Sequence, residues 1–283
     1  MGQPRTANKR RKRAALSLYM QNVSSNDTHA DPRRRRSYDE QRVVMEPIER
    51  IDAAEIPGGG ELWLLRCGSE FSIQFGEDEL MGSQDFDSEK ALASFAIGRM
   101  GARRDRILIG GLGMGFTLGA ALAALPDTTA VVVAELVPTV VTWATGPLAH
   151  LFGGHLNDPR VSLEIRDVHD VIADSPAEFD AILLDVDNGP DGFMRAANDR
   201  LYCNWGLRSA YAALRPGGVL AIWSAYDDAA FVNRLKGAGF SVESASVDAV
   251  GSPIPKRYTI WLAVKPETSL AKVDDQPPRM ERL

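Results

Sequence analysis

Glycines and acidic side chains stand at the ends of four predicted strands of this chain. The buried run at residues 106–110 leads into Gly111, Gly113 and Gly115, and a helical segment follows. Glycines at such a place permit a tight turn and let the backbone approach a ligand closely. Their spacing is G-x-G-x-G. It is not the G-x-G-x-x-G of dinucleotide folds, because Phe116 occupies the position of the third glycine.

Three carboxylates follow at the ends of the next predicted strands. Glu135 closes the second strand, 24 residues after Gly111, where a carboxylate can accept both hydroxyls of a ribose. Asp167 ends the third strand, within reach of an adenine amino group, and Asp185 ends the fourth. Each acid alone is an ordinary strand end, and the glycines alone could form a tight turn. Because parallel strands end at one edge of their sheet, the set together predicts a nucleoside site.

The elements that must position these residues alternate between strand and helix over residues 106–237. This alternation predicts an α/β fold with a doubly wound, Rossmann-like, mainly parallel sheet. The runs at residues 241–247 and 257–265 follow without an intervening helix, which predicts an antiparallel pair closing the sheet. The segment over residues 199–214 is predicted to be a helix that ends at residues 215–218, "RPGG".

A shorter, strand-rich segment precedes this alternation. Residues 61–68 and 70–76 are apolar-rich runs on either side of a glycine turn, and we expect them to form a hairpin. A helix should follow from about Ser88, with Ser88 as its N-cap.

Charge is distributed unevenly along the chain. Residues 1–42 carry 11 Lys and Arg against 4 Asp and Glu, whereas the remainder carries 21 against 34. The basic runs in this tail would bind nucleic acid or an anionic surface, or would be a solvated disordered segment. Alternatively, translation starts at Met45. The acidic remainder argues against a nucleic-acid-binding core, so nucleic acid is expected only through the tail, if at all.

Cysteine and histidine spacing predicts neither disulfides nor a metal site. Cys67 and Cys203 form no CxxC pair, and the four histidines show no ligand spacing, so a reducing cytoplasm is expected. Residues 107–126 are uncharged over about the length of a membrane span. Their glycines cluster at one end, which favours a turn, and we expect neither a membrane segment nor a signal peptide.

Five stretches carry a resemblance to a known family: "ILIGGLGMG", "VVVAEL", "VSLEIRDVHDVI", "FDAILLDVDNGP" and "LYCNWGLRSAYAALRPGGVLAIW". Over about residues 45–265 the chain resembles the spermidine synthases, polyamine aminopropyltransferases of the class I S-adenosylmethionine-dependent methyltransferase superfamily. The resemblance implies a seven-stranded methyltransferase sheet behind a small N-terminal β-domain. It also implies S-adenosylmethionine or its decarboxylated form as co-substrate, with no metal, and a homodimer.

The family's residue roles carry over onto three acids of this chain. Glu135 and Asp167 match its nucleoside-binding acids, and Asp185 matches the base that deprotonates the attacking amine. The domains that follow from this reading are a basic tail over 1–42, a β-rich domain over 43–87, a transferase domain over 88–266 and a polar tail over 267–283.

The sequence departs from the family at the residues that would hold a diamine. The family's "GGGDGG" is "GGLGMG" here, without the acid. The second aspartate of "D-x-x-D-P" falls on Asn188, beside Asp187, and a Tyr-Gln pair appears as Ser88-Glu89. Glu89, Asp187, Asn188 and Tyr202 are therefore candidate acceptor-binding residues.

Two further aromatic residues, Trp205 and Trp223, are candidate walls of the acceptor pocket, although aromatics at these spacings are more often core.

Three functions follow from these residues. The chain would transfer an aminopropyl group from decarboxylated S-adenosylmethionine to a small amine, with Asp185 as base. Alternatively, it would methylate a small acceptor from S-adenosylmethionine, or bind a nucleoside without catalysis. In both transfers the sulfonium is already a good electrophile, so alignment of the acceptor is the enzyme's main task. The acidic rim favours a cationic acceptor.

Overall fold

The structure is a computed structural model that describes residues 47–186, 200–249 and 256–267. Residues Pro47–Leu283 form one compact unit. The basic tail and the alternative start at Met45 lie outside the described residues, and the domain boundaries given above stay predictions.

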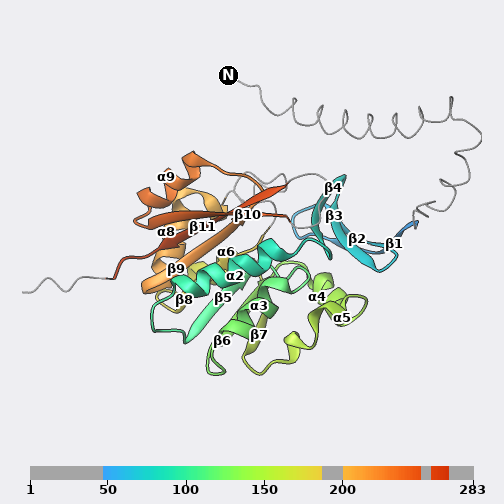
Figure 1. The fold of residues 1–283 in the computed structure, drawn as a ribbon, viewed down its shortest axis with the longest axis horizontal. Helices are drawn as coiled ribbons and strands as arrows, with labels where there is room; N and C mark the ends of the chain where they lie inside the picture. The colour runs from blue at the N-terminus through green and yellow to red at the C-terminus, as the bar shows by residue number, and fades with distance from the viewer. Residues whose placement is uncertain (1–46, 187–199, 250–255, 268–283) are drawn as a thin grey trace, which may run out of the picture. The chain divides into compact units, whose positions relative to one another are not determined.

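A seven-stranded sheet forms the larger part of the described chain, in the order β10-β11-β9-β8-β5-β6-β7 (Figure 1). Neighbours among β5–β9 pair in parallel, whereas β11 pairs antiparallel with both β9 and β10. The bounds are β5 Arg106–Gly110, β6 Ala130–Glu135, β7 Val161–Ile165, β8 Phe179–Leu184, β9 Leu214–Ser224, β10 Ser241–Asp248 and β11 Arg257–Val264. The predicted α/β class and the closing antiparallel pair are confirmed.

The direction of winding reverses at β5. The chain passes from β5 to β6 and β7 on one side, then returns to place β8 on the other side of β5. Loops that follow two neighbouring strands with opposite winding diverge, and open α/β sheets bind ligands in the crevice this leaves. The crevice therefore lies between the ends of β5 and β8, which carry the predicted glycines and Asp185.

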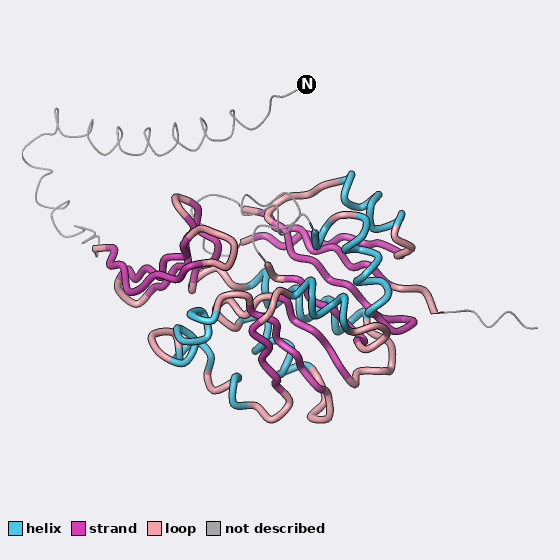
Figure 2. The backbone as a smooth tube through the Cα atoms, turned by 180° about the vertical axis from the view of Figure 1, so that it is seen from behind, coloured by secondary structure: helices cyan, strands magenta, loops and turns pink. Residues whose placement is uncertain are grey.

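Helices cover both faces of this sheet, because alternate strand residues point to opposite faces (Figure 2). Ile107 and Ile109 of β5 join the core beneath α2, α3 and α4, whereas Leu108 joins the core beneath α6, α8 and α9. The helices are α2 Asp87–Arg99, α3 Phe116–Ala124, α4 Pro138–Thr145, α5 Ala149–Phe152, α6 Val168–Asp174, α8 Asn204–Ala213 and α9 Ala229–Gly237, with a 3-10 turn at His155–Asn157.

A separate antiparallel sheet of four strands, in the order β1-β2-β3-β4, precedes the larger one. Its strands are β1 Ile48–Glu55, β2 Glu61–Cys67, β3 Glu70–Phe75 and β4 Asp78–Gly82. The pairing of β2 with β3 confirms the predicted hairpin. Leu64 and Ile73 are buried in the same core as α2 and α3, and Trp143 of α4 donates a 2.8 Å hydrogen bond to Asp52. The small sheet therefore packs against α2, α3 and α4.

One local prediction was wrong. Ser88 is not an N-cap: α2 begins at Asp87, and the Ser88 hydroxyl donates to its neighbour Glu89 instead. α8 ends before residues 215–218, as predicted, and these residues form the first part of β9, where Gly217 and Gly218 exchange backbone hydrogen bonds with Lys265. The pairing of β8 with β9 shifts register there, so the glycines form a bulge in the strand.

Candidate functional site

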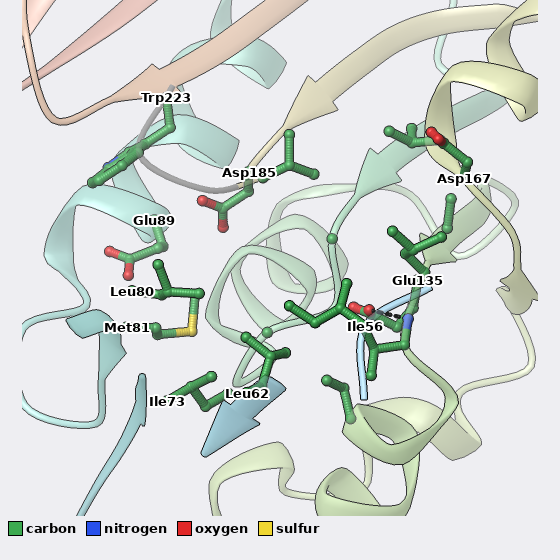
Figure 3. A pocket seen from close by; sticks show the side chains of 18 residues that line it. Ile56, Leu62, Ile73, Leu80, Met81, Glu89, Glu135, Asp167, Asp185 and Trp223 are labelled. Atoms are coloured by element: carbon green, nitrogen blue, oxygen red, sulfur yellow. Dashed lines mark hydrogen bonds between the residues drawn. The ribbon is translucent and has the colours of Figure 1, made fainter. Parts of the chain in front are cut away.

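One cavity opens at the carboxyl ends of β5, β6, β7 and β8 (Figure 3). Its lining includes Gly111, Gly113, Glu135, Asp167 and Asp185, which are all but one of the residues that the sequence assigned to the nucleoside and to the base. The parallel sheet brings them together, although 74 positions separate Gly111 from Asp185. Gly115, the remaining nucleoside-site prediction, is not among the lining residues.

The backbone of the glycine loop is packed too closely against its neighbours to leave room for a side chain. Gly111 has φ +89°, and a Cβ there would lie 2.5 Å from the backbone oxygen of Asp185. Gly113 has φ +48°, and a Cβ there would lie 2.6 Å from the Met81 methyl carbon. Gly115, with φ +81°, is the N-cap of α3, and a Cβ there would collide with the Phe152 ring. The bare backbone at Gly111 and Gly113 is exposed to the cavity, as a ligand held by close backbone approach requires.

Glu135 is held at the end of β6 by backbone donors. One carboxylate oxygen accepts from the Leu112 N–H at 2.9 Å and the other from the Val137 N–H at 2.8 Å. Burial raises the pKa of Glu135, while these N–H groups oppose the rise because they stabilise the charged form. The backbone N–H groups of Leu136 and Gly113 oppose the rise as well, so four backbone donors orient this carboxyl group where it lines the cavity.

Asp167 has a structural role in addition to its place in the cavity. It is the N-cap of α6, where one carboxylate oxygen accepts from the His169 N–H at 2.9 Å. The other oxygen lies 3.9 Å from the Arg200 guanidinium. One oxygen is therefore committed to the helix, and the other is available at the edge of the cavity.

Asp185 and Glu89 form an acidic pair linked through α3. The Thr117 hydroxyl lies 2.5 Å from an Asp185 oxygen and 3.4 Å from the Glu89 carbonyl oxygen, and Ser88 donates to the Glu89 carboxylate at 2.6 Å. Burial raises the pKa of both carboxyls; the Asp185 charge raises that of Glu89 further, and the Thr117 hydrogen bond opposes the rise at Asp185. The pair therefore holds protons more readily than exposed carboxylates do.

The other predicted acceptor residues occupy different surroundings. Trp223 lines the cavity beside Glu89 (Figure 3), and its buried indole N–H has no hydrogen-bond partner among the described residues. Tyr202 is buried in the core with its ring against Phe231, and Trp205 is 59% exposed, so neither lines the cavity. Asp187 and Asn188 lie outside the described residues.

Several residues of the site were not found from the sequence. Thr117 is the polar residue in an otherwise apolar helical stretch, and this was an available signal for its role. Leu62, Ile73, Leu80 and Met81 form an apolar part of the lining that comes from the small sheet. Nothing in those strand sequences distinguishes residues facing a cavity from residues facing a core.

No protein-family model and no curated protein matches this chain. Solved structures do. A spermidine synthase in complex with the transition-state analogue AdoDATO matches at TM-score 0.65 and 19% identity, over 76% of this chain and 73% of that one. The chain has the fold of the spermidine synthases.

Two further spermidine synthase structures support the same fold. The enzyme from Thermotoga maritima matches at TM-score 0.62 and 18% identity, over 76% of this chain and 72% of that one. A probable spermidine synthase from Corynebacterium glutamicum matches at TM-score 0.53 and 15% identity, over 75% and 79%. The spermidine-synthase-like fold recognised in the sequence, with its methyltransferase sheet and small N-terminal sheet, is confirmed.

No His, Cys, Asp or Glu side chains of the described residues gather in groups of three suited to a metal ion. No helix in the same ranges combines the length and apolar composition needed to cross a bilayer.

The close approach of Gly111 to Asp185 predicts that Gly111→Ala is strongly destabilising. Placing alanine in this left-handed backbone conformation lowers the free energy of unfolding by about 1–2 kcal/mol. Displacing the Asp185 backbone lowers it by about 1–3 kcal/mol more. Gly153→Ala is the matched control, since Gly153 also has a positive φ but its Cβ would meet nothing within 4 Å. Urea denaturation compares the free energies of unfolding; equal losses in the two variants would contradict a tight contact at the crevice.

Proposed function

We propose that the chain is a spermidine-synthase-like transferase that binds decarboxylated S-adenosylmethionine and transfers its aminopropyl group to a small amine. The observation that carries the proposal is the convergence of Gly111, Gly113, Glu135, Asp167 and Asp185 on one cavity at the reversal of the sheet. Under this proposal Glu135 accepts the ribose hydroxyls and Asp167 accepts the adenine amino group. The backbone of the glycine loop lies against the rest of the nucleoside.

The charge of the cavity supports the decarboxylated donor. Four carboxylates line it, Glu89, Glu135, Asp167 and Asp185, and no Lys, Arg or His lines it among the described residues. Intact S-adenosylmethionine carries a carboxylate that would find no cation there, whereas the decarboxylated form adds only positive charge to an acidic cavity. The AdoDATO complex belongs to a protein of the same fold.

Asp185 is the proposed base. The bound sulfonium supplies an electrophilic carbon, and the residues of this chain must align an uncharged amine with it. Asp185 takes a proton from the acceptor nitrogen, Thr117 fixes the orientation of the Asp185 carboxylate, and the buried Glu89 is the second acidic group at this end of the cavity. A raised pKa suits this role, because a base works best when its pKa lies near the working pH.

Methyl transfer from S-adenosylmethionine is a second candidate. One observation favours it: Met81 lies over Gly113, and the Met114 N–H donates to the Met81 sulfur at 3.1 Å. By the resemblance, an acid belongs in this glycine motif. An apolar side chain over the loop suits a donor whose transferred group is uncharged.

Removing the base tests the proposed mechanism. We expect Asp185→Asn to lower the rate of 5′-methylthioadenosine release from decarboxylated S-adenosylmethionine by about 10²–10⁴-fold in the presence of excess amine. Asp174→Asn, at a 67% exposed side chain, is the control and should leave the rate unchanged. A rate for Asp185→Asn within about threefold of wild type would exclude Asp185 as the base.

The hydrogen bond from Thr117 predicts a shift in the pH profile. It lowers the pKa of Asp185, so its loss in Thr117→Val should raise that pKa further. Asp185 accepts a proton only when ionised, and the acid limb of kcat/KM should therefore move to higher pH. Thr117→Ser keeps the hydroxyl and should retain the wild-type limb. A Thr117→Val limb that stays in place or moves to lower pH would contradict the assigned contact.

A further inference from the structure

Two residues outside the cavity, Tyr258 and Asp85, adjoin the side chains at its acceptor end. That end is formed by Asp185, Glu89 and Trp223, and Figure 3 shows the Glu89 carboxylate beside the Trp223 ring. Tyr258 packs its ring against Trp223, with 5.1 Å between the ring centroids. The Tyr258 hydroxyl donates a 2.8 Å hydrogen bond to Asp85, four positions before Glu89. Neither Tyr258 nor Asp85 lines the cavity, so any effect that they have on it passes through these neighbours.

The antiparallel pairing of β9 with β11 places Tyr258 beside Trp223. Ile260 of β11 pairs with Trp223 of β9, and Tyr258 stands two positions from Ile260, so it points to the same face of the sheet. Tyr258 is partly buried there, in the same core as α2. The ring therefore fills the space beside the indole, while the hydroxyl extends to the segment that precedes α2.

Asp85 lies in this segment, which joins β4 of the small sheet to α2. The next residue, Phe86, stacks its ring on Phe116 at the start of α3, with 4.5 Å between the ring centroids. Asp85 itself joins the segment to β11 through the tyrosine hydroxyl. This hydrogen bond therefore connects the large sheet to the first turn of the helix that carries Glu89.

The surroundings of the Tyr258 hydroxyl keep it a hydrogen-bond donor. Burial, the hydrogen bond to Asp85 and the charges of Asp85, Glu89 and Glu79 raise the pKa of Tyr258, so the phenol stays protonated. The second oxygen of Asp85 is buried and has no partner among the described residues. Loss of the hydroxyl would therefore leave this carboxylate without the hydrogen bond that supports its position, and a carboxylate in that state is drawn towards water.

We propose that Tyr258 and Asp85 are positioning residues for the acceptor end of the cavity. The Tyr258 ring holds the Trp223 ring in place, and the hydrogen bond to Asp85 holds the start of α2, which keeps Glu89 beside Asp185. This inference rests on the proposed function and adds to it two residues that do not touch the substrate. The nucleoside end, at the ends of β5, β6 and β7, does not depend on this hydrogen bond.

Separate measurements at the two ends of the cavity test the proposal. Tyr258→Phe keeps the ring and removes the hydroxyl, and Tyr211→Phe is the matched control, since Tyr211 also packs its ring against another aromatic ring, that of Phe240. With 1,4-diaminobutane or butylamine as the probe amine, Tyr258→Phe should raise the KM of the amine by about tenfold. Its calorimetric affinity for 5′-methylthioadenosine should stay unchanged, and Tyr211→Phe should alter neither quantity. An unchanged KM, or an equal loss at both ends, would overturn the proposal.

Variants at Asp85 separate the hydrogen bond from the charge. Asp85→Asn keeps an oxygen that can accept from the Tyr258 hydroxyl, whereas Asp85→Ala removes it. Asp85→Ala should therefore raise the KM of the amine as Tyr258→Phe does, and Asp85→Asn should stay near the wild type. Because both residues act through one hydrogen bond, combining Tyr258→Phe with Asp85→Ala should be no worse than either change alone. Additive losses, or an Asp85→Asn variant as defective as Asp85→Ala, would contradict the proposal.

A failure of the proposed function is seen in the wild type instead. If the wild-type chain releases no 5′-methylthioadenosine from the decarboxylated donor with either amine, the transfer is wrong, whatever the variants show. Amide hydrogen exchange then decides the role of the hydrogen bond alone: exchange over residues 83–89 should be faster in Tyr258→Phe than in Tyr211→Phe. Equal exchange in the two variants would overturn that role as well.

Discussion

The contact between the ends of β5 and β8 is the constraint on which the site depends. The Asp185 N–H donates to the Gly110 carbonyl at 2.9 Å, and the Gly111 Cα faces the Asp185 carbonyl so closely that a Cβ would lie 2.5 Å from it. These contacts fix the start of the glycine loop and the proposed base relative to each other. Because the winding of the sheet reverses at this pair of strands, the space above them stays open for a ligand.

The small N-terminal sheet supplies an apolar wall of this crevice. Leu62, Ile73, Leu80 and Met81 come from three of its strands and line the cavity, with Leu80 and Met81 next to Glu89 (Figure 3). The same sheet is tied to α4 through Trp143 and Asp52. Burial is the largest cause of the raised pKa at both Glu89 and Asp185. Carboxyls in this setting are suited to moving a proton near neutral pH.

Other acids in the chain show why the position of a carboxylate matters more than its presence. Asp180, also on β8, is 4% exposed, but it accepts from the backbone N–H groups of Asp105 and Arg106 and lies 3.0 Å from Arg215. It lies near the amino end of β8, whereas the cavity lies at the carboxyl ends of the strands. Asp185 follows the same strand five residues later and has no such cation beside it among the described residues.

The sequence predicted the sheet and the residues at its strand ends because both follow from local patterns. Apolar runs of strand length, glycines after β5 and acids after β6, β7 and β8 need no knowledge of distant contacts. Thr117 was missed although it is the polar residue of an otherwise apolar helical stretch. The contribution of Leu80 and Met81 could not be predicted, since it depends on how the small sheet packs over α2 and α3. The failed N-cap at Ser88 has the same origin: a serine beside a buried glutamate donates to that carboxylate rather than capping the helix.

Calorimetric titration with decarboxylated and intact S-adenosylmethionine tests the central claim, that the cavity holds a cationic nucleoside donor. We expect one molecule of the decarboxylated form to bind, more tightly than the intact form. Asp167→Asn should weaken that binding by about tenfold, with α6 still capped because asparagine caps helices well. Saturable binding of neither compound, or affinity that Asp167→Asn leaves unchanged, would contradict this account of the site.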